Sequence, residues 1–254
     1  MAAGEFGLQA PFLKRVYFRE PPKDRAEYPL SLPILDGLDL TFSTPVTVIV
    51  GENGSGKSTL LETIAYHCGF NVSGGNRDHV YDQTADVAPL AKALTFAWRP
   101  KVAQGFFMRA ESFFNFAGYL DEMSRHAGSV AYASYGGSSL HRQSHGEAFL
   151  SLFENRFGGK GIYILDEPEA ALSPQRQIQL LAILRALEES GEAQVIMATH
   201  SPILMAYPNA DLYYLQGDTI RLADYRETGH YRITRRFLEN PDAYLREIFD
   251  RFDA

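Results

Sequence analysis

The sequence predicts an α/β fold built on a mixed, mainly parallel central sheet that helices cover. Three short segments, 46–50, 162–165 and 195–198, are apolar and rich in β-branched residues, which is typical of strands buried on both faces. Helical periodicity follows two of them, at 58–68 and 175–190. Strand, loop and helix in this order indicate parallel strands joined by helical crossovers.

The remaining elements follow from shorter patterns. We expect further strands at 16–18, 38–42 and 105–108, a hairpin formed by 212–215 and 219–222, and helices at 111–125 and 147–156. A polar helical tail is expected over 225–254. Ligands bind at the carboxyl ends of parallel strands, so the loops after Val50, Leu165 and Ala198 are the candidate functional loops.

Bulk composition sets the limits of the prediction. The chain has 254 residues, of which 45% are hydrophobic, so it is long enough for one large domain over 1–254. A net charge of −7 weakens a general affinity for nucleic acid or anionic membranes. The single cysteine, Cys68, excludes an intrachain disulfide and is expected to be a small buried side chain. No apolar run approaches a membrane span and no signal peptide is evident, so a cytoplasmic location is expected.

The loop after the first buried strand reads Gly51-Glu52-Asn53-Gly54-Ser55-Gly56-Lys57-Ser58 and fits the phosphate-binding pattern G-x-x-x-x-G-K-[ST] in full. Glycines let backbone N–H groups turn toward phosphate oxygens, and the following helix directs its positive end at the same anion. We expect the Lys57 ammonium to reach the β- and γ-phosphates of a nucleotide and Ser58 to ligate Mg²⁺.

Two carboxylates, Asp166 and Glu167, follow the second buried strand. A carboxylate at the end of a buried strand is costly without a partner, and Mg²⁺ held through water would offset that cost for Asp166. Glu167 is expected to face the γ-phosphate and to act as the general base that activates water. The alternative for this pair alone is a cap for the next helix.

Taken together, these motifs resemble those of the ABC ATPase superfamily of P-loop NTPases, and most closely the small stand-alone ATPases grouped with its chromosome-maintenance and DNA-repair branch. Residues 166–174 look like an extended Walker B motif with its D-loop, and 198–202 look like the loop of the switch histidine. Residues 144–147 look like a variant of the ABC signature. The resemblance implies an N-terminal antiparallel β part and a short helical signature subdomain at about 110–155.

The resemblance also assigns roles by residue. It implies Glu167 and His200 as catalytic residues, with His200 sensing the γ-phosphate. The implied nucleotide contacts are Asn53, Gly54, Ser55, Gly56, Lys57, Ser58, Thr59, Arg19, Ser144, Gly146 and Glu147. The implied Mg²⁺ ligands are Ser58, Asp166 and Glu111. Because the signature of this superfamily contacts ATP bound to the opposite protomer, an ATP-dependent head-to-tail homodimer is expected.

The chain departs from the superfamily pattern in two places. Where its Q-loop glutamine is expected, the sequence offers Arg109 or Glu111, and Glu111 could equally open a helix. His145 replaces the first glycine of the signature. Adenine recognition is poorly marked, and Tyr17, Phe18 and Tyr28 are candidates that could equally be core or surface aromatics.

Two functions remain open at this point. The first is a soluble, ATP-dependent dimerising switch that acts with a nucleic acid or a protein partner in a defence- or repair-related process. The second, less favoured by the motif variants, is the nucleotide-binding subunit of a membrane transporter with a permease partner. The short segment between Glu111 and Ser144 lacks the heptads of a long coiled coil, which excludes a long-armed DNA tether. The basic residues Arg232, Arg235 and Arg236 favour a solvated helix face over a nucleic-acid contact.

Overall fold

The computed structural model describes residues 9–72, 86–110 and 159–252, together with the helical positions 147, 149, 150 and 153. The strands are β1 (Leu13–Tyr17), β2 (Asp39–Thr41), β3 (Val46–Gly51), β4 (Thr95–Trp98), β5 (Gly105–Arg109), β6 (Gly161–Asp166), β7 (Ala193–Ala198), β8 (Asp211–Gln216) and β9 (Thr219–Leu222). The α-helices are α1 (Lys57–Cys68), α2 (Ala88–Ala93), α5 (Pro174–Ser190), α6 (Pro202–Met205), α7 (Gly229–Glu239) and α8 (Pro241–Phe252). Three 3₁₀ turns are η1 (Pro33–Gly37), η4 (Pro168–Ala171) and η5 (Tyr225–Glu227).

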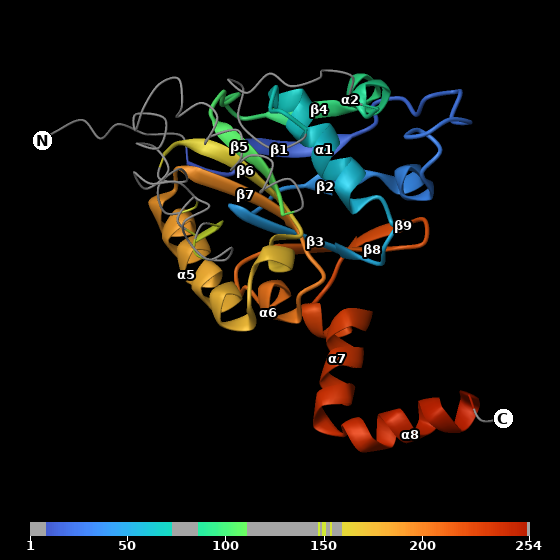
Figure 1. The fold of residues 1–254 in the computed structure, drawn as a ribbon. Helices are drawn as coiled ribbons and strands as arrows, with labels where there is room; N and C mark the ends of the chain where they lie inside the picture. The colour runs from blue at the N-terminus through green and yellow to red at the C-terminus, as the bar shows by residue number, and fades with distance from the viewer. Residues whose placement is uncertain are drawn as a thin grey trace, which may run out of the picture.

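The central sheet has six strands in the order β5-β6-β7-β3-β8-β9. The first five are parallel, and β9 pairs antiparallel with β8 as the second strand of the hairpin. A separate three-stranded antiparallel sheet, β2-β1-β4, lies beside it (Figure 1). The predicted mixed, mainly parallel sheet and the antiparallel N-terminal part are therefore confirmed. The helical subdomain expected at about 110–155 lies almost entirely outside the described residues.

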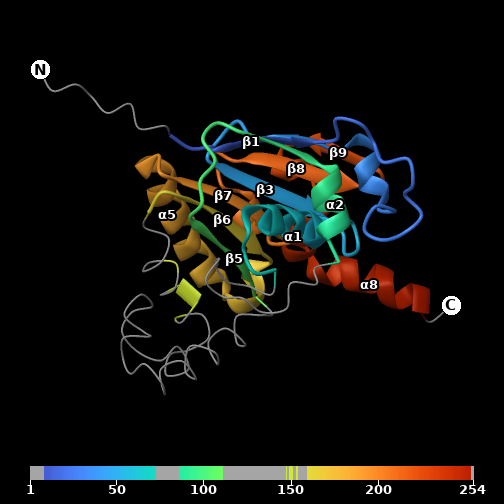
Figure 2. The ribbon, with the colours of Figure 1, turned by 90° about the horizontal axis from the view of Figure 1, so that it is seen from above.

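Two hydrophobic clusters hold the sheet between layers of helices and strands. Along β3, Val48 and Val50 pack into the cluster that α5 and α6 cover, whereas Ile49 packs into the cluster shared with α1 and the antiparallel sheet. The view from above shows α1 and α5 on opposite sides of the strands (Figure 2). Because side chains alternate along a strand, an apolar run such as 46–50 supplies both clusters at once.

Helix α1 begins directly after the glycine loop and buries its apolar face. Leu60, Leu61 and Ile64 are almost fully buried, as the helical spacing predicted. Cys68, in its last turn, is 1% exposed, which confirms the interpretation of a small buried side chain. Gly69 ends the helix in the left-handed conformation and donates backbone hydrogen bonds to the last turn, a common helix termination.

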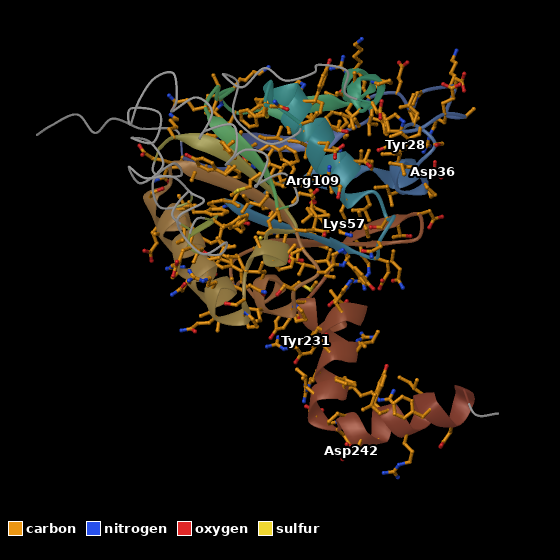
Figure 3. All side chains as sticks on the ribbon, viewed as in Figure 1. Tyr28, Asp36, Lys57, Arg109, Tyr231 and Asp242 are labelled. Carbon is orange, nitrogen blue, oxygen red and sulfur yellow. The ribbon has the colours of Figure 1, made fainter. Side chains whose placement is uncertain are left out.

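Helices α7 and α8 form an arm that extends away from the sheets and their covering helices (Figure 1). Figure 3 labels Tyr231 at the base of α7 and Asp242 at the start of α8, where the chain turns. The arm carries exposed apolar side chains, including Ile233, Leu238 and Phe249. The helical tail predicted over 225–254 is thus present as two helices. Within the part of the chain that the structure describes, no helix is long and apolar enough to cross a membrane.

The side chain of Gln194 joins the two sheets. This fully buried glutamine on β7 accepts hydrogen bonds from the backbone N–H groups of Phe12 and Leu13, both at 2.8 Å, and donates to the Leu13 carbonyl at 2.9 Å. Its amide therefore satisfies three backbone groups at the start of β1. Buried backbone groups left without partners are strongly destabilising.

We predict that Gln194→Leu lowers the free energy of unfolding by about 2–4 kcal/mol, because it leaves these backbone groups buried without partners. Chemical denaturation followed by circular dichroism measures the change. Gln179→Leu on the exposed face of α5 is the matched control, expected to change stability by less than about 0.5 kcal/mol. Equal stability of the two variants would show that the amide does not hold β1 in place.

Candidate active site

The loop between β3 and α1 has a backbone that depends on its glycines. A Cβ at Gly51 would lie 2.6 Å from Ser55 Oγ and 2.9 Å from the Leu215 carbonyl oxygen of β8. Gly56 has a φ of 93° directly before α1, in the left-handed region that favours glycine. The loop is therefore folded tightly over the end of β3, with no room for a side chain at Gly51.

Lys57 is the first residue of α1 and lies where the parallel strands end (Figure 3). It is 4% exposed, and its ammonium donates hydrogen bonds to the carbonyl oxygens of Gly51 at 2.8 Å and Glu52 at 3.1 Å. Burial lowers the pKa of Lys57, while the neighbouring carboxylates, led by Glu167 and Asp166, act to raise it. The Lys57 ammonium is therefore held by two backbone carbonyls and lies near the carboxylates of Glu167 and Asp166.

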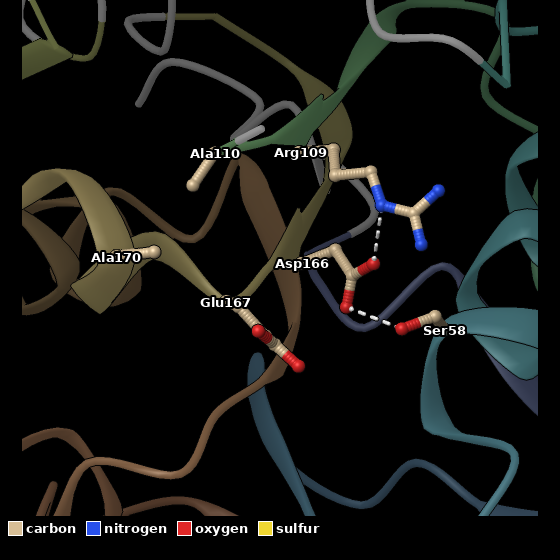
Figure 4. A pocket seen from close by; sticks show the side chains of 6 residues that line it. All are labelled: Ser58, Arg109, Ala110, Asp166, Glu167 and Ala170. Atoms are coloured by element: carbon tan, nitrogen blue, oxygen red, sulfur yellow. Dashed lines mark hydrogen bonds and ion pairs between the residues drawn. The ribbon is translucent and has the colours of Figure 1, made fainter. Parts of the chain in front are cut away.

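Asp166 ends β6 and is the most deeply buried carboxylate of the site, at 2% exposure. Its Oδ1 accepts a hydrogen bond from Ser58 Oγ at 3.2 Å, and its Oδ2 forms an ion pair with Arg109 Nε at 3.2 Å (Figure 4). Arg109 also pairs with Glu62 of α1 at 2.7 Å. Burial raises the pKa of Asp166, whereas the Arg109 cation and the Ser58 hydroxyl oppose that rise.

Arg109 reaches Asp166 because of strand register. Residue 109 of β5 stands directly beside residue 166 of β6 in the parallel ladder. The sequence placed either Arg109 or Glu111 at the position of the missing Q-loop glutamine. The structure brings Arg109 to the carboxylate, while Glu111 lies outside the described residues.

Glu167 has an unusual backbone. Among the described non-glycine residues it alone has a positive φ, 50°, and its N–H donates to the Ala198 carbonyl of β7 at 3.0 Å. Left-handed backbone is uncommon for a residue with a side chain and is found preferentially at functional positions. It turns Glu167 into a pocket of about 40 Å³ lined by Ser58, Arg109, Ala110, Asp166, Glu167 and Ala170 (Figure 4).

His200 follows β7 and points its Nε2 toward this carboxylate. The distance from His200 Nε2 to Glu167 Oε1 is 3.3 Å. The His200 backbone N–H donates to a carboxylate oxygen of Glu169, and Ser201 caps α6 just beyond it. The loop is therefore fixed on both sides of the histidine. Burial and the nearby Lys57 cation lower the pKa of His200, and Glu167 acts against them.

A second histidine, which the sequence did not single out, completes this cluster. His230 near the start of α7 places Nε2 2.8 Å from Nδ1 of His200. His200 and His230 are thirty positions apart in the sequence and fit no motif. Their contact depends on where α7 joins the rest of the molecule. Local sequence contains a signal for the helix start, since Thr228 caps α7, but none for the contact.

Several other nucleotide contacts predicted from the sequence lie away from the glycine loop or outside the described residues. Arg19 is exposed beyond the end of β1, and in the described part of the chain no hydrogen bond or ion pair joins it to the glycine loop. Tyr28 and Thr59 share a hydrogen bond between their hydroxyls at 3.1 Å, which places one candidate aromatic beside α1. Ser144 and Gly146 lie outside the described residues. Glu147 is an exposed helical residue that pairs with Arg176 of α5 at 2.9 Å.

The residues present suit a nucleotide phosphate and a magnesium ion. Ser55 Oγ is buried and has no hydrogen-bond partner among the described residues, and the buried His200 Nε2 has only the long contact to Glu167, so both can contact a ligand. Ser58 and Asp166 offer a hydroxyl and a carboxylate 3.2 Å apart, the oxygen ligands that Mg²⁺ prefers. No cluster of three or more His, Cys, Asp or Glu side chains suited to a metal occurs in the described ranges.

A glycine loop of the phosphate-binding pattern between β3 and α1, with an Asp-Glu pair at the end of β6 in the same sheet, is typical of P-loop ATPases. Family models described as "AAA domain" and as "AAA domain, putative AbiEii toxin, Type IV TA system" match residues 31–91 and 140–206. Within the P-loop ATPases, the chain is similar to ATP-binding proteins of the ABC class.

The chain is similar to ATP-binding proteins of cobalt import. The cobalt import ATP-binding proteins CbiO of Salmonella paratyphi A and Salmonella typhimurium are both 29% identical to this chain over 208 residues, covering 72% of each chain. Among solved structures, cbiO1 of Clostridium perfringens, part of the ABC transporter complex cbiONQ, has a TM-score of 0.48 at 17% identity, covering 93% of this chain and 99% of that one. The SMC head domain of Thermotoga maritima has a TM-score of 0.45 at 17% identity, covering 84% and 98%.

We predict that Gly51→Ala destabilises the fold by about 1–3 kcal/mol, because the added methyl group overlaps Ser55 and the backbone of β8. The displaced loop is also expected to bind nucleotide at least about tenfold more weakly, a loss of about 1.4 kcal/mol. Thermal unfolding and titration with a fluorescent ATP analogue measure the two effects. Gly37→Ala is the control, since a Cβ there meets nothing within 4 Å. A Gly51 variant that behaves like the Gly37 variant would contradict the tight packing of this loop.

Proposed function

We propose that this chain is a Mg²⁺-dependent ATP hydrolase that works as an ATP-dependent homodimer. The observation that carries the proposal is the meeting of three chain segments at one sheet edge: Lys57 and Ser58, Asp166 and Glu167, and His200. Each segment follows a parallel strand, so the sheet itself fixes the relative positions of these side chains.

Binding of the triphosphate is assigned to the glycine loop. Backbone N–H groups of residues 53–59 surround the phosphates, and the first turn of α1 adds its positive dipole end. The Lys57 ammonium exchanges its two carbonyl contacts for phosphate oxygens, which carry more charge. Ser58 Oγ and Asp166 Oδ1 would hold Mg²⁺, which when bound neutralises charge that develops on the phosphates.

Hydrolysis is assigned to Glu167 and His200. The left-handed backbone turns the Glu167 carboxylate into the pocket beside Asp166, where it accepts a proton from a water that attacks the γ-phosphate. His200 Nε2, buried and 3.3 Å from a Glu167 oxygen, donates a hydrogen bond to the terminal phosphate. The Arg109 ion pair opposes the rise in the pKa of Asp166 that burial causes, and it balances the negative charge of the two adjacent carboxylates.

Dimerisation follows from the resemblance of residues 144–147 to an ABC signature. We infer that Ser144, Gly146 and Glu147 of one protomer contact ATP bound to the other. In the described structure Glu147 is held by Arg176 of α5, close in sequence to the D-loop residues 166–174. That ion pair would connect the signature helix to the segment that carries the catalytic carboxylates.

A second candidate function is the energising subunit of a membrane transporter. The CbiO relatives, named as cobalt import ATP-binding proteins, favour this role over a stand-alone switch with a nucleic-acid partner. In addition, the basic residues of α7 are engaged within the arm, since Arg235 pairs with Glu239 at 2.7 Å and Arg236 with Glu247 at 3.5 Å. Affinity purification from a detergent-solubilised membrane fraction distinguishes the two roles. An integral-membrane partner recovered in equal amounts supports the transporter subunit, and recovery of the chain from the soluble fraction alone supports the switch.

We predict that Lys57→Ala weakens ATP binding by about 100-fold or more, since a charge-assisted contact to phosphate is lost. Isothermal titration with MgATP measures the affinity. Lys92→Ala, an exposed position on α2, is the control and is expected to bind like the unmodified protein. Retention of the original affinity by the Lys57 variant would reject the phosphate site.

We predict that Glu167→Gln binds ATP normally but hydrolyses it about 10²–10⁴-fold more slowly, because an amide cannot accept the proton. The trapped ATP is expected to hold the protein as a dimer. Phosphate release and light scattering coupled to size exclusion measure the two effects, with the exposed Glu192→Gln as control. Hydrolysis at the original rate would exclude Glu167 as the base, and a monomer with bound ATP would exclude the dimer.

A further inference from the structure

The contact between His200 and His230 brings the C-terminal arm to the active site. The rings are tilted by 53° with centroids 4.9 Å apart, and a nitrogen of each ring lies in hydrogen-bond range of the other. His200 belongs to the catalytic pair proposed above, whereas His230 belongs to α7. No motif assigns a role to His230, so its role must be argued from this geometry.

His230 is held firmly at the base of the arm. The fully buried Thr228 caps α7, accepting from the Tyr231 N–H at 3.3 Å and donating to the Tyr225 carbonyl at 2.7 Å. The Gly229 N–H donates to the Tyr214 hydroxyl of β8 at 3.4 Å. The first turn of α7 is therefore attached to the central sheet, and His230 lies in that turn.

The surroundings of His200 select one tautomer. Its Nε2 lies 3.3 Å from a Glu167 oxygen, and a carboxylate presents lone pairs, so this nitrogen must carry the hydrogen. Burial and Lys57 lower the pKa of His200, which keeps the ring neutral. In a neutral ring with a hydrogen on Nε2, Nδ1 is an acceptor. The hydrogen in the 2.8 Å contact then comes from His230 Nε2.

The remaining nitrogen of His230 agrees with this assignment. His230 Nδ1 is buried and has no hydrogen-bond partner among the described residues. A buried N–H without an acceptor is rarer than an acceptor without a donor, so Nδ1 is the unprotonated nitrogen and Nε2 the donor. The opposite tautomers would place a bare His200 nitrogen against the Glu167 carboxylate and bury an unpartnered N–H on His230.

We propose that His230 is a positioning residue: by donating to His200 Nδ1 it fixes the ring tautomer and orientation that present the Nε2 hydrogen to Glu167 and the terminal phosphate, and so makes the α7–α8 arm part of the hydrolytic site. This inference rests on the proposed ATPase function for its catalytic consequence. The hydrogen bond between the two rings does not depend on that function and is tested separately.

The experiment compares His230→Phe with His230→Gln. Phenylalanine keeps an aromatic ring of similar shape but removes the donor, whereas the glutamine amide places an N–H at nearly the reach of His Nε2. We expect His230→Phe to lower kcat for ATP about 5- to 10-fold, the effect of one neutral hydrogen bond, with the KM for ATP within about twofold. His230→Gln is expected to recover most of kcat. Arg235→Ala, on the exposed side of α7, is the control for changes to the helix.

The second measurement is ¹⁵N NMR of the histidine side chains without nucleotide. The unmodified protein should show His200 with Nε2 protonated and Nδ1 bare, and the phenylalanine variant should show a mixture of tautomers. Unchanged kcat and an unchanged tautomer in His230→Phe would overturn the proposal. So would equal losses in the Phe and Gln variants, since these indicate a structural role for His230. If the unmodified protein hydrolyses ATP no faster than Lys57→Ala, the ATPase function fails, and the NMR result still decides whether His230 orients His200.

Discussion

The burial of one carboxylate, Asp166, is the constraint on which the site depends. A charge that is 2% exposed is unfavourable unless its partners are in place, and they come from separate elements: Arg109 from β5 and Ser58 from α1. Strand register and the position of α1 must therefore be correct for both partners to reach Asp166. The same three side chains line the pocket into which Glu167 is turned. The contacts made by the two carboxylate oxygens of Asp166 therefore affect both the stability of the fold and the chemistry of the site.

Backbone groups hold several of the charges around Asp166. Lys57 is held by loop carbonyls, the Glu169 carboxylate accepts from the His200 N–H, and the Glu167 N–H donates to the Ala198 carbonyl. A bound triphosphate adds negative charge where the cation lies, and a divalent ion adds positive charge where the carboxylates lie. Because backbone groups fix Lys57 and Glu169 in place, less reorganisation would be needed during hydrolysis.

Local pattern was sufficient to predict the buried strands, the glycine loop, α1, α5 and the terminal hairpin, because each depends on residues close together in the chain. It missed β4, where all four residues are half-buried and the strand is defined by pairing with β1.

Among the site residues, Lys57, Ser58 and Asp166 could be predicted from motifs. The sequence could not decide whether Arg109 or Glu111 stands at the position of the Q-loop glutamine, because that depends on strand register. It could not predict the contact of His230 with the site, because that contact depends on where α7 attaches. Arg19, proposed by resemblance, has no described contact with the glycine loop.

The attachment of α7 by its first turn has a mechanical consequence. Eleven residues of helix rise about 16 Å, and α8 continues beyond Asn240 in a new direction. A rigid rod fixed at one end amplifies rotation, so a tilt of about ten degrees at Thr228 would displace the far end of α7 by about 3 Å. Changes of an ångström or less around the terminal phosphate would then be converted into a displacement large enough for another molecule to detect.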